Sequence, residues 1–194
     1  MKTKTVKVAL CGLFTALIIV GAFLRIPIPV IPFTFQTLFV VLAGALLGSK
    51  GGAASTACYA LMGLLGIPVF TQGGGFGYVL QPSFGYILGF IGGAFLTGLL
   101  IERAEKLTFW RALAAIFAGL AVIYLAGMIY GYILCNYVLG IALGFYALIL
   151  HYFLMVIPGD ICLCILAAVL TVKLRPVLKK IRSSRKVVGL QNKI

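Results

Sequence analysis

The sequence predicts an all-α integral membrane protein. Of its 194 residues, 63% are hydrophobic and only 10% are charged, whereas an ordinary soluble domain has about 25% charged residues. Apolar runs of near membrane-spanning length fill most of the chain and are separated by short connectors. Several more such runs follow the first, so the first run does not indicate a cleaved signal peptide. We therefore expect one membrane domain over residues 1–194.

The apolar runs define six expected spans, at about 6–24, 34–48, 53–69, 82–101, 109–133 and 158–174. With the N-terminus in the cytoplasm, fifteen of the sixteen Lys and Arg residues fall inside and only Arg25 falls outside. This bias follows the positive-inside rule and predicts a multi-pass protein of the cell membrane with both termini cytoplasmic. The basic cytoplasmic tail, 175–194, is expected to lie against anionic lipid headgroups, and we expect no nucleic-acid binding.

The segment 140–157 is also long enough to cross the membrane. A seventh crossing would place the basic tail outside, against the charge rule. If the segment crossed in place of the last run, the apolar stretch 161–172 would be left at the surface. We therefore expect 140–157 to be an outer interfacial or partly re-entrant helix, with Tyr146 and Tyr152 in an interfacial aromatic belt.

The chain has few of the groups that catalysis or metal binding requires. Its five cysteines and one histidine form no zinc-ligand spacing, and it lacks a phosphate-binding loop for ATP hydrolysis. We therefore expect no metal, no cofactor and no catalytic residues, with energy supplied by a partner. The alternative is an intramembrane hydrolase that uses a dyad of Ser83 and His151. Ser83 is better explained as a helix cap, and His151 falls in an outer connector.

The expected topology gathers the unusual polar residues on the outer side, where they predict a ligand pocket. Asp160 opens the last span, and it is either a simple helix cap or the acceptor of two hydrogen bonds from a ligand. Arg25 either reaches lipid phosphate or binds a ligand carboxylate. Gln36 and Gln81 each offer a donor and an acceptor. The expected apolar walls are Phe33, Phe70, Phe76, Tyr78, Tyr86 and Tyr152.

The connector 67–81, which we call the flap, has three consecutive glycines among aromatic residues and no charge. Without Lys or Arg, it does not read as a phosphate-binding loop. Gly74 and Gly75 let the backbone approach a ligand closely and fold over it, because glycine has no side chain and tolerates positive φ. The flap is therefore expected to be a lid, and the alternative is a mobile connector without a role.

Two stripes of small residues predict close helix packing. In the span 82–101 the stripe consists of Gly85, Gly89 and Gly93 and indicates an internal contact. On the first span, the stripe is either a docking surface for another membrane subunit or a second internal contact; its members are Ala9, Gly12 and Ala16.

Three stretches resemble the BioY family, the biotin-binding membrane component of energy-coupling factor (ECF) transporters. They are IPFTFQTLFVVLAGALLGSKGG, GIPVFTQGGGFGYVLQPSFGYILGFIGGA and IPGD, and the likeness is densest over 26–94 and 157–160. The resemblance implies a subunit that binds biotin with high affinity from outside. It also implies association with a transmembrane coupling subunit and two cytoplasmic ATPases. A component for another vitamin, such as thiamine, is the alternative within this class.

The resemblance also implies roles for individual residues. Asp160 matches the family's Gly-Asp motif and would accept the paired N–H groups of the ureido ring of biotin. Many members of the family carry a Lys about one turn after this Asp, where this chain has Leu163 and Cys164. Arg25 as the partner of the biotin carboxylate rests on charge placement alone. The positions that match the other motifs are Gln36, Gly74, Gly75, Tyr86 and Gly89.

Overall fold

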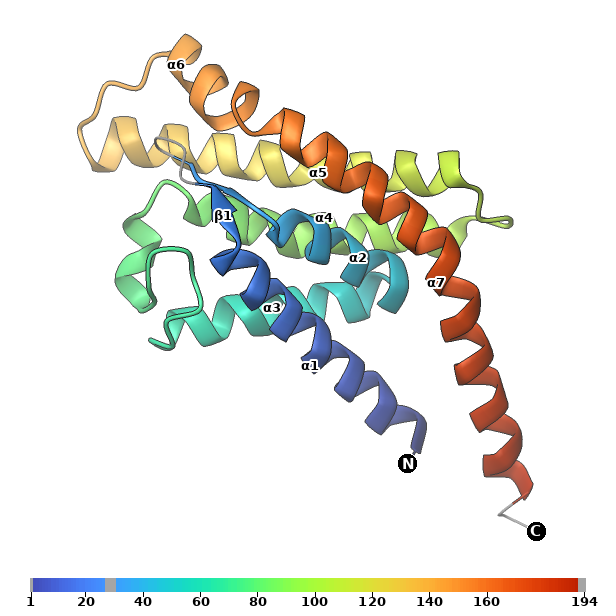
Figure 1. The fold of residues 1–194 in the computed structure, drawn as a ribbon. Coiled ribbons are helices and arrows are strands. Elements are labelled where there is room, and N and C mark those ends of the chain that lie inside the picture. Colours follow the sequence, from blue (N-terminus) through green and yellow to red (C-terminus); the bar gives the residue numbers. More distant parts are fainter. Residues whose placement is uncertain (1, 27–30, 192–194) are drawn as a thin grey trace.

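The computed structural model describes residues 2–26 and 31–191, with side chains described for 5–26 and 31–177. The protein is a bundle of helices with a short two-stranded antiparallel sheet (Figure 1). The longer helices are α1 (Lys2–Phe23), α2 (Gln36–Leu47), α3 (Ser49–Leu64), α4 (Phe84–Arg103), α5 (Phe109–Ile133) and α7 (Ile157–Gln191). The short elements are β1 (Arg25–Ile26), β2 (Phe33–Thr34), the 3-10 turn η1 (Phe76–Leu80), the π-helical turns η2 (Leu134–Val138) and η3 (Leu150–Leu154), and α6 (Phe145–Ile149).

The helices run back and forth, so their connections collect at two ends of the bundle. The connections that precede α2, α4 and α7 lie at one end, on the left in Figure 1, which we call the connector end. At the opposite, terminal end α1 begins, α7 ends and α4 turns into α5. The three connectors expected on the outer side are 25–33, 67–81 and 134–157, and their described parts therefore share one end of the molecule. Residues 27–30 of the first connector lie outside the described residues.

Four segments within the described residues are long and apolar enough to cross a membrane: Thr5–Phe23, Phe84–Arg103, Phe109–Val138 and Phe145–Val177. The expectation of a multi-pass helical protein is confirmed, but two of the six expected spans correspond to helices that are shorter than the bilayer core is thick. Helices α2 and α3 have 12 and 16 residues, or about 18 and 24 Å at 1.5 Å per residue. A bilayer core is about 30 Å thick.

The two helices are short because apolar sequence next to them forms irregular backbone. Residues 31–35 precede α2 and residues 65–69 follow α3, and both stretches lie at the connector end. Non-helical backbone is tolerated at membrane depth where protein covers it or where it lines a cavity. Ile31 and Val69 are each 5% exposed. The apolar pattern therefore predicts correctly that these residues are buried, but it does not predict the lengths of α2 and α3.

The boundary between α2 and α3 also differs from the expectation. Gly48 has a φ of 87° and turns the chain between the two helices. The Glu102 carboxylate accepts hydrogen bonds from the amide of Ser49 at 3.2 Å and from its hydroxyl at 2.8 Å. A carboxylate at a helix N-terminus stabilises the first turn, so α3 begins at Ser49, four residues before the expected span at 53.

The last helix extends beyond the expected span 158–174. Helix α7 continues through Pro176 to Gln191, so most of the basic tail 175–194 is helical. Ahead of it, α6 and η3 lead into α7, and Tyr152 in η3 is fully buried, which corrects its expected place in the aromatic belt. Tyr146 is 79% exposed and fits that belt. The interfacial position of 140–157 stays a prediction.

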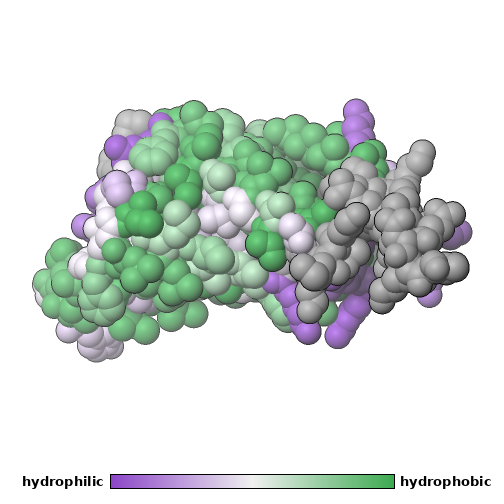
Figure 2. All heavy atoms as spheres, turned by 90° about the horizontal axis from the view of Figure 1, so that it is seen from below, coloured by the Kyte–Doolittle hydropathy of each residue, from purple (hydrophilic) through white to green (hydrophobic). Residues whose placement is uncertain are grey.

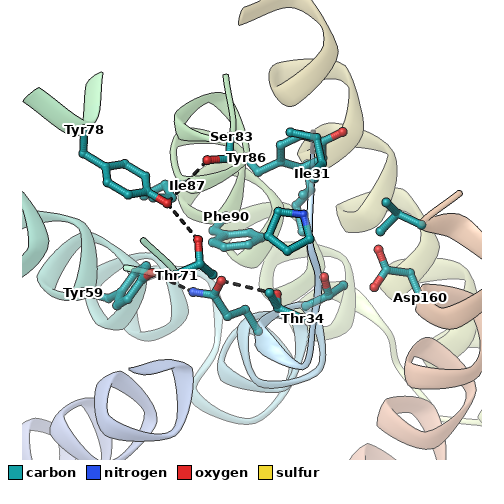
Figure 3. A pocket seen from close by; sticks show the side chains of 15 residues that line it. Ile31, Thr34, Tyr59, Thr71, Tyr78, Ser83, Tyr86, Ile87, Phe90 and Asp160 are labelled. Carbon is teal, nitrogen blue, oxygen red and sulfur yellow. Dashed lines mark hydrogen bonds between the residues drawn. The ribbon is translucent and has the colours of Figure 1, made fainter. Parts of the chain in front are cut away.

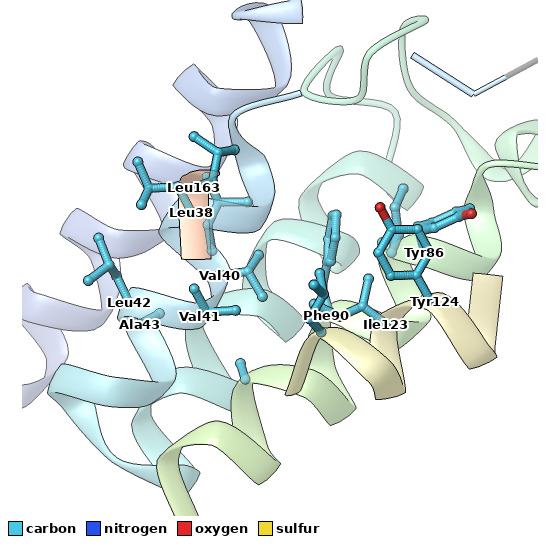
Figure 4. Packing of buried hydrophobic residues seen from close by; sticks show 14 of the residues in the cluster. Leu38, Val40, Val41, Leu42, Ala43, Tyr86, Phe90, Ile123, Tyr124 and Leu163 are labelled. Atoms are coloured by element: carbon cyan, nitrogen blue, oxygen red, sulfur yellow. The ribbon is translucent and has the colours of Figure 1, made fainter. Parts of the chain in front are cut away.

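Close packing of α4 against α5 depends on the predicted glycine stripe. A Cβ at Gly89 would lie 2.8 Å from the Ile123 carbonyl oxygen, and one at Gly93 would lie 2.8 Å from that of Gly119. The internal contact predicted for this stripe is therefore confirmed. Side chains from α2, α4 and α5 fill the buried interior, as Val41, Phe90 and Ile123 show in Figure 4.

Large apolar side chains remain exposed over the middle of the bundle. In Figure 2, apolar residues cover most of one face, and hydrophilic residues lie mainly toward its two ends. Exposed examples are Leu61 on α3, Leu88 on α4 and Leu125 on α5. An apolar surface of this extent is typical of contact with lipid.

Candidate functional site

A pocket of about 50 Å³ lies at the connector end, among helices α2, α3, α4, α5 and α7 (Figure 3). Polar groups face it from opposite sides: Asp160 on one side, and Tyr59, Thr71 and Tyr78 on the other. A few convergent polar groups in an apolar cavity are typical of a small-molecule site. The lining residues are Ile31, Pro32, Thr34, Gln36, Thr37, Tyr59, Thr71, Tyr78, Ser83, Tyr86, Ile87, Phe90, Ile123, Val156 and Asp160.

Asp160 supplies a buried carboxylate with one free oxygen. It lies in the first turn of α7 and is 4% exposed. Its Oδ2 accepts a hydrogen bond from the Tyr124 hydroxyl at 2.7 Å. The Thr37 side chain also lies beside the carboxylate, but no group among the described residues makes a hydrogen bond of good geometry to Oδ1. A buried polar atom without a partner is costly, so this oxygen is suited to a ligand that donates a hydrogen bond.

The segment that carries β2 brings further polar groups to the opposite wall. The amide nitrogen of Gln36 donates to the Tyr59 hydroxyl at 2.7 Å, and the hydroxyl of Thr34 lies 3.3 Å from Oε1 of Gln36. Phe33, the residue before Thr34, packs against Gly159, where any Cβ would meet the Phe33 ring. Glycine at 159 therefore lets β2 approach the start of α7, beside Asp160.

The flap closes the pocket with hydroxyl groups. The Thr71 and Tyr78 hydroxyls are 2.8 Å apart, and Tyr78 lies 3.4 Å from the Ser83 hydroxyl. At its base, the amide of Gly75 donates to the Gly63 carbonyl of α3 at 2.7 Å. Gly75 has a φ of 104°, a conformation that favours glycine. The close backbone approach seen at Gly75 is made to α3, and the predicted approach to a ligand stays a prediction.

Tyr86 joins the pocket to the segment before α7. Its hydroxyl donates to the backbone carbonyl of Tyr152, and its ring packs edge-on against Tyr124 with centroids 5.9 Å apart. Tyr152 itself is buried against Gly131, where a Cβ would meet its ring. Tyr86 thus faces the cavity, whereas Tyr152 supports it from behind.

Four of the predicted ligand-binding residues line the pocket: Asp160, Gln36, Tyr78 and Tyr86. The others surround it without lining it. Phe33 and Tyr152 are buried supports, Gly89 packs on α5, and Gly74 abuts the Ile67 carbonyl. The amide of Gly75 donates a hydrogen bond to α3. Phe76 is 79% exposed, and Gln81 is also exposed. Arg25 is exposed, and its guanidinium donates a hydrogen bond to the Thr71 carbonyl. Ligand contact by each of these residues stays a prediction.

Sequence reasoning missed several groups of the site. Tyr59 and Tyr124 provide hydroxyls within apolar helices, and Thr37 and Thr71 lie beside residues that were predicted. The available signal was a tyrosine inside an apolar span, because a buried tyrosine hydroxyl usually finds a partner. Phe90 could have been predicted from helical spacing, because it lies one turn after Tyr86 on the same helix.

The hydrolase alternative gains no support from the geometry. Ser83 lines the pocket, but its hydroxyl makes no capping bond to α4, contrary to the predicted cap. Nδ1 of His151 lies 2.9 Å from the Ala147 carbonyl oxygen, and His151 is not among the lining residues. The described residues contain no group of three or more His, Cys, Asp or Glu side chains placed to hold a metal.

The stripe on α1 faces away from the bundle. Ala9, Gly12 and Ala16 are all exposed, and a Cβ at Gly12 would meet nothing within 4 Å. The internal contact considered for this stripe is therefore wrong. Docking of another subunit remains as its prediction.

Comparisons with known proteins agree on one family. The profile described as the BioY family matches residues 1–180. A probable biotin transporter BioY of Lysinibacillus sphaericus is 41% identical over 180 residues, which cover 93% of this chain and 92% of that protein. The biotin transporter BioY of Thermotoga maritima is 46% identical over 118 residues, covering 60% and 69% of the two chains.

A solved structure agrees with these relatives in fold. The crystal structure of the S-component for biotin from an ECF-type ABC transporter matches with a TM-score of 0.79 and 29% identity. The match covers 90% of this chain and 93% of that one. The chain belongs to the BioY family.

Proposed function

We propose that this chain is the biotin-capture subunit of a vitamin transporter. The observation that carries the proposal is the free Oδ1 of Asp160, a buried carboxylate oxygen at the pocket. The ureido ring of biotin presents two parallel N–H donors, and a carboxylate accepts such a pair with one donor on each oxygen. Oδ2 keeps a second lone pair beside the Tyr124 bond, so both oxygens can take part.

The rest of the lining suits the remainder of biotin. Ile87, Phe90, Ile123 and Val156 give apolar contact to the thiophane ring and the aliphatic chain. The hydroxyls of Thr71, Tyr78 and Ser83, opposite Asp160, can donate hydrogen bonds to the biotin carboxylate. The proposed partners of the biotin carboxylate are therefore these hydroxyl groups and not Arg25, which is exposed and does not line the pocket.

Biotin requires a larger pocket than the one observed. Small-molecule pockets measure about 300–1,000 Å³, whereas this one holds about 50 Å³. Its covers are the flap and the segment with β2, which carry Thr71 and Thr34 into the lining. We infer that these covers separate to admit the ligand and then close over it in a wider arrangement, which is the lid role expected of the flap.

The pocket is proposed to open outside the cell. It lies at the connector end, where Arg25 is the one cation of the connectors, whereas Lys7, Arg103 and Lys106 belong to the terminal end. Transport is powered by the partners that the family implies, a transmembrane coupling subunit and two cytoplasmic ATPases. The exposed stripe of α1 is the proposed surface for the coupling subunit.

Titration of the purified chain with biotin tests the proposal. We expect saturable one-to-one binding that excess thiamine does not displace. Absence of biotin binding to folded protein would contradict the proposed function. Displacement by thiamine would assign the pocket to the other vitamin.

A further inference from the structure

The two covers of the pocket are joined by one exposed side chain. Arg25 in β1 pairs with Thr34 in β2, and Thr34 lines the pocket. The guanidinium of Arg25 donates through Nη1 to the carbonyl oxygen of Thr71 in the flap, 46 residues away. Arg25 is thus connected to both covers, through its backbone on one side and its side chain on the other.

Thr71 carries this connection into the pocket wall. Its hydroxyl lies 2.8 Å from that of Tyr78, and both residues line the cavity. The position of the Thr71 backbone therefore determines where two of the lining hydroxyls lie. Because Arg25 holds that backbone from outside, it acts on the pocket without touching it.

The flap carries Thr71 in a tight turn that starts from a fixed base. Phe70 is 1% exposed and packs edge-on against Tyr59 with ring centroids 5.4 Å apart. Phe70 and Gly73 exchange two backbone hydrogen bonds, of 2.9 and 3.3 Å, and so close a tight turn in which Gly73 has a φ of 113°. Thr71 lies between the fixed Phe70 and Gly73, so the Arg25 bond is the side-chain restraint that connects this part of the flap to β1.

We propose that Arg25 is a latch: its bond to Thr71 holds the two covers together and controls how fast the ligand binds and leaves. The inference rests on the proposed function, since the ligand is biotin. Opening the pocket requires the covers to separate, and separation breaks this hydrogen bond. A net hydrogen bond is worth about 0.5–1.5 kcal/mol, so its removal should raise the opening rate about 2- to 12-fold.

The latch predicts a kinetic pattern that a ligand contact would not give. Removing it speeds both opening for association and opening for release, so the Kd of biotin changes little. A residue that bonds the ligand carboxylate would instead alter release and Kd, and only for ligands that carry the carboxylate. Neutral biotin amide separates the two roles, because it keeps the ureido ring and lacks the negative charge.

The experiment measures association and dissociation rates of radiolabelled biotin and biotin amide with the full chain by rapid filtration. The variants are Arg25→Ala, Arg25→Gln and Arg25→Lys. Arg111→Ala is the matched control, because Arg111 is an exposed arginine that donates to a backbone carbonyl, that of Lys106, at the terminal end. We expect Arg25→Ala to raise both rates at least twofold for both ligands, Arg25→Lys to restore them in part, and Arg111→Ala to leave them unchanged.

Three results would overturn the latch: unchanged rates in Arg25→Ala, an effect seen with biotin but absent with biotin amide, or equal effects of Arg25→Ala and Arg111→Ala. Loss of thermal stability without a change in rates belongs to the first of these. Failure of the wild-type chain to bind biotin would instead contradict the proposed function, so the two failures are distinguishable.

Discussion

Removal of the Tyr124 hydroxyl should destabilise the ligand-free protein through Asp160. Tyr124 gives the Asp160 carboxylate its hydrogen bond, at 2.7 Å, and both residues are 4% exposed. A hydrogen bond to a charged group is worth about 1.5–3 kcal/mol. In a chain of this size, each kcal/mol shifts Tm by about 2–4 °C, so Tyr124→Phe should lower Tm by about 3–12 °C.

The assay is thermal unfolding of the purified protein in detergent, with Tyr137→Phe as the control. Tyr137 is 78% exposed, so its hydroxyl can be removed at little cost. The loss in Tyr124→Phe should shrink when Asp160→Asn is also present, because Asn can accept only a weaker, neutral hydrogen bond from Tyr124 and both substitutions therefore act on one interaction. An equal loss in both backgrounds, or none in either, would refute the link between Tyr124 and the carboxylate.

Three further predictions test the packing and the docking surface. Gly89→Val should lower the free energy of unfolding by about 1–3 kcal/mol, because the added side chain overpacks against Ile123. Unfolding in detergent measures this loss. Gly12→Val is the control and should lower the free energy of unfolding far less, because its side chain meets open space. Gly12→Trp should abolish co-purification with the coupling subunit and leave biotin affinity unchanged; retained co-purification would argue against docking on α1. Glu102→Gln should lower Tm by weakening the two bonds to Ser49 without altering biotin affinity; an unchanged Tm would show that this carboxylate does not stabilise α3.

The long helices could be predicted from the sequence because their ends are local. The span expected at 109–133 coincides with α5, where the side chain of Thr108 accepts from the amide of Arg111 and caps the helix. The lengths of α2 and α3 were not predictable in this way. They depend on whether other elements cover the adjoining irregular backbone, which is a property of the tertiary structure.

The residues of the candidate site also differ in whether a local signal in the sequence could identify them. Asp160 could be identified because it is the one acid outside the cytoplasmic loop between the fourth and fifth expected spans. Tyr59 and Tyr124 could have been expected to have hydrogen-bond partners, as tyrosines inside apolar spans, but the sequence does not show which face of the helix they occupy and so could not place them at the site. The distribution of charges predicted that Arg25 lies at the connector end. Its partner is a backbone carbonyl in the flap, which no residue pattern in the sequence reveals.

The most direct test asks whether the Asp160 carboxylate pairs with the ureido N–H groups. Biotin and a biotin methylated on a ureido nitrogen are titrated against the wild-type chain and against Asp160→Asn. Loss of a charge-assisted hydrogen bond should weaken binding of biotin to Asp160→Asn about 10- to 150-fold. Methylation should weaken binding to the wild type by a similar factor and to Asp160→Asn far less. Equal biotin affinity of the two proteins, or an equal cost of methylation in both, would contradict the pairing.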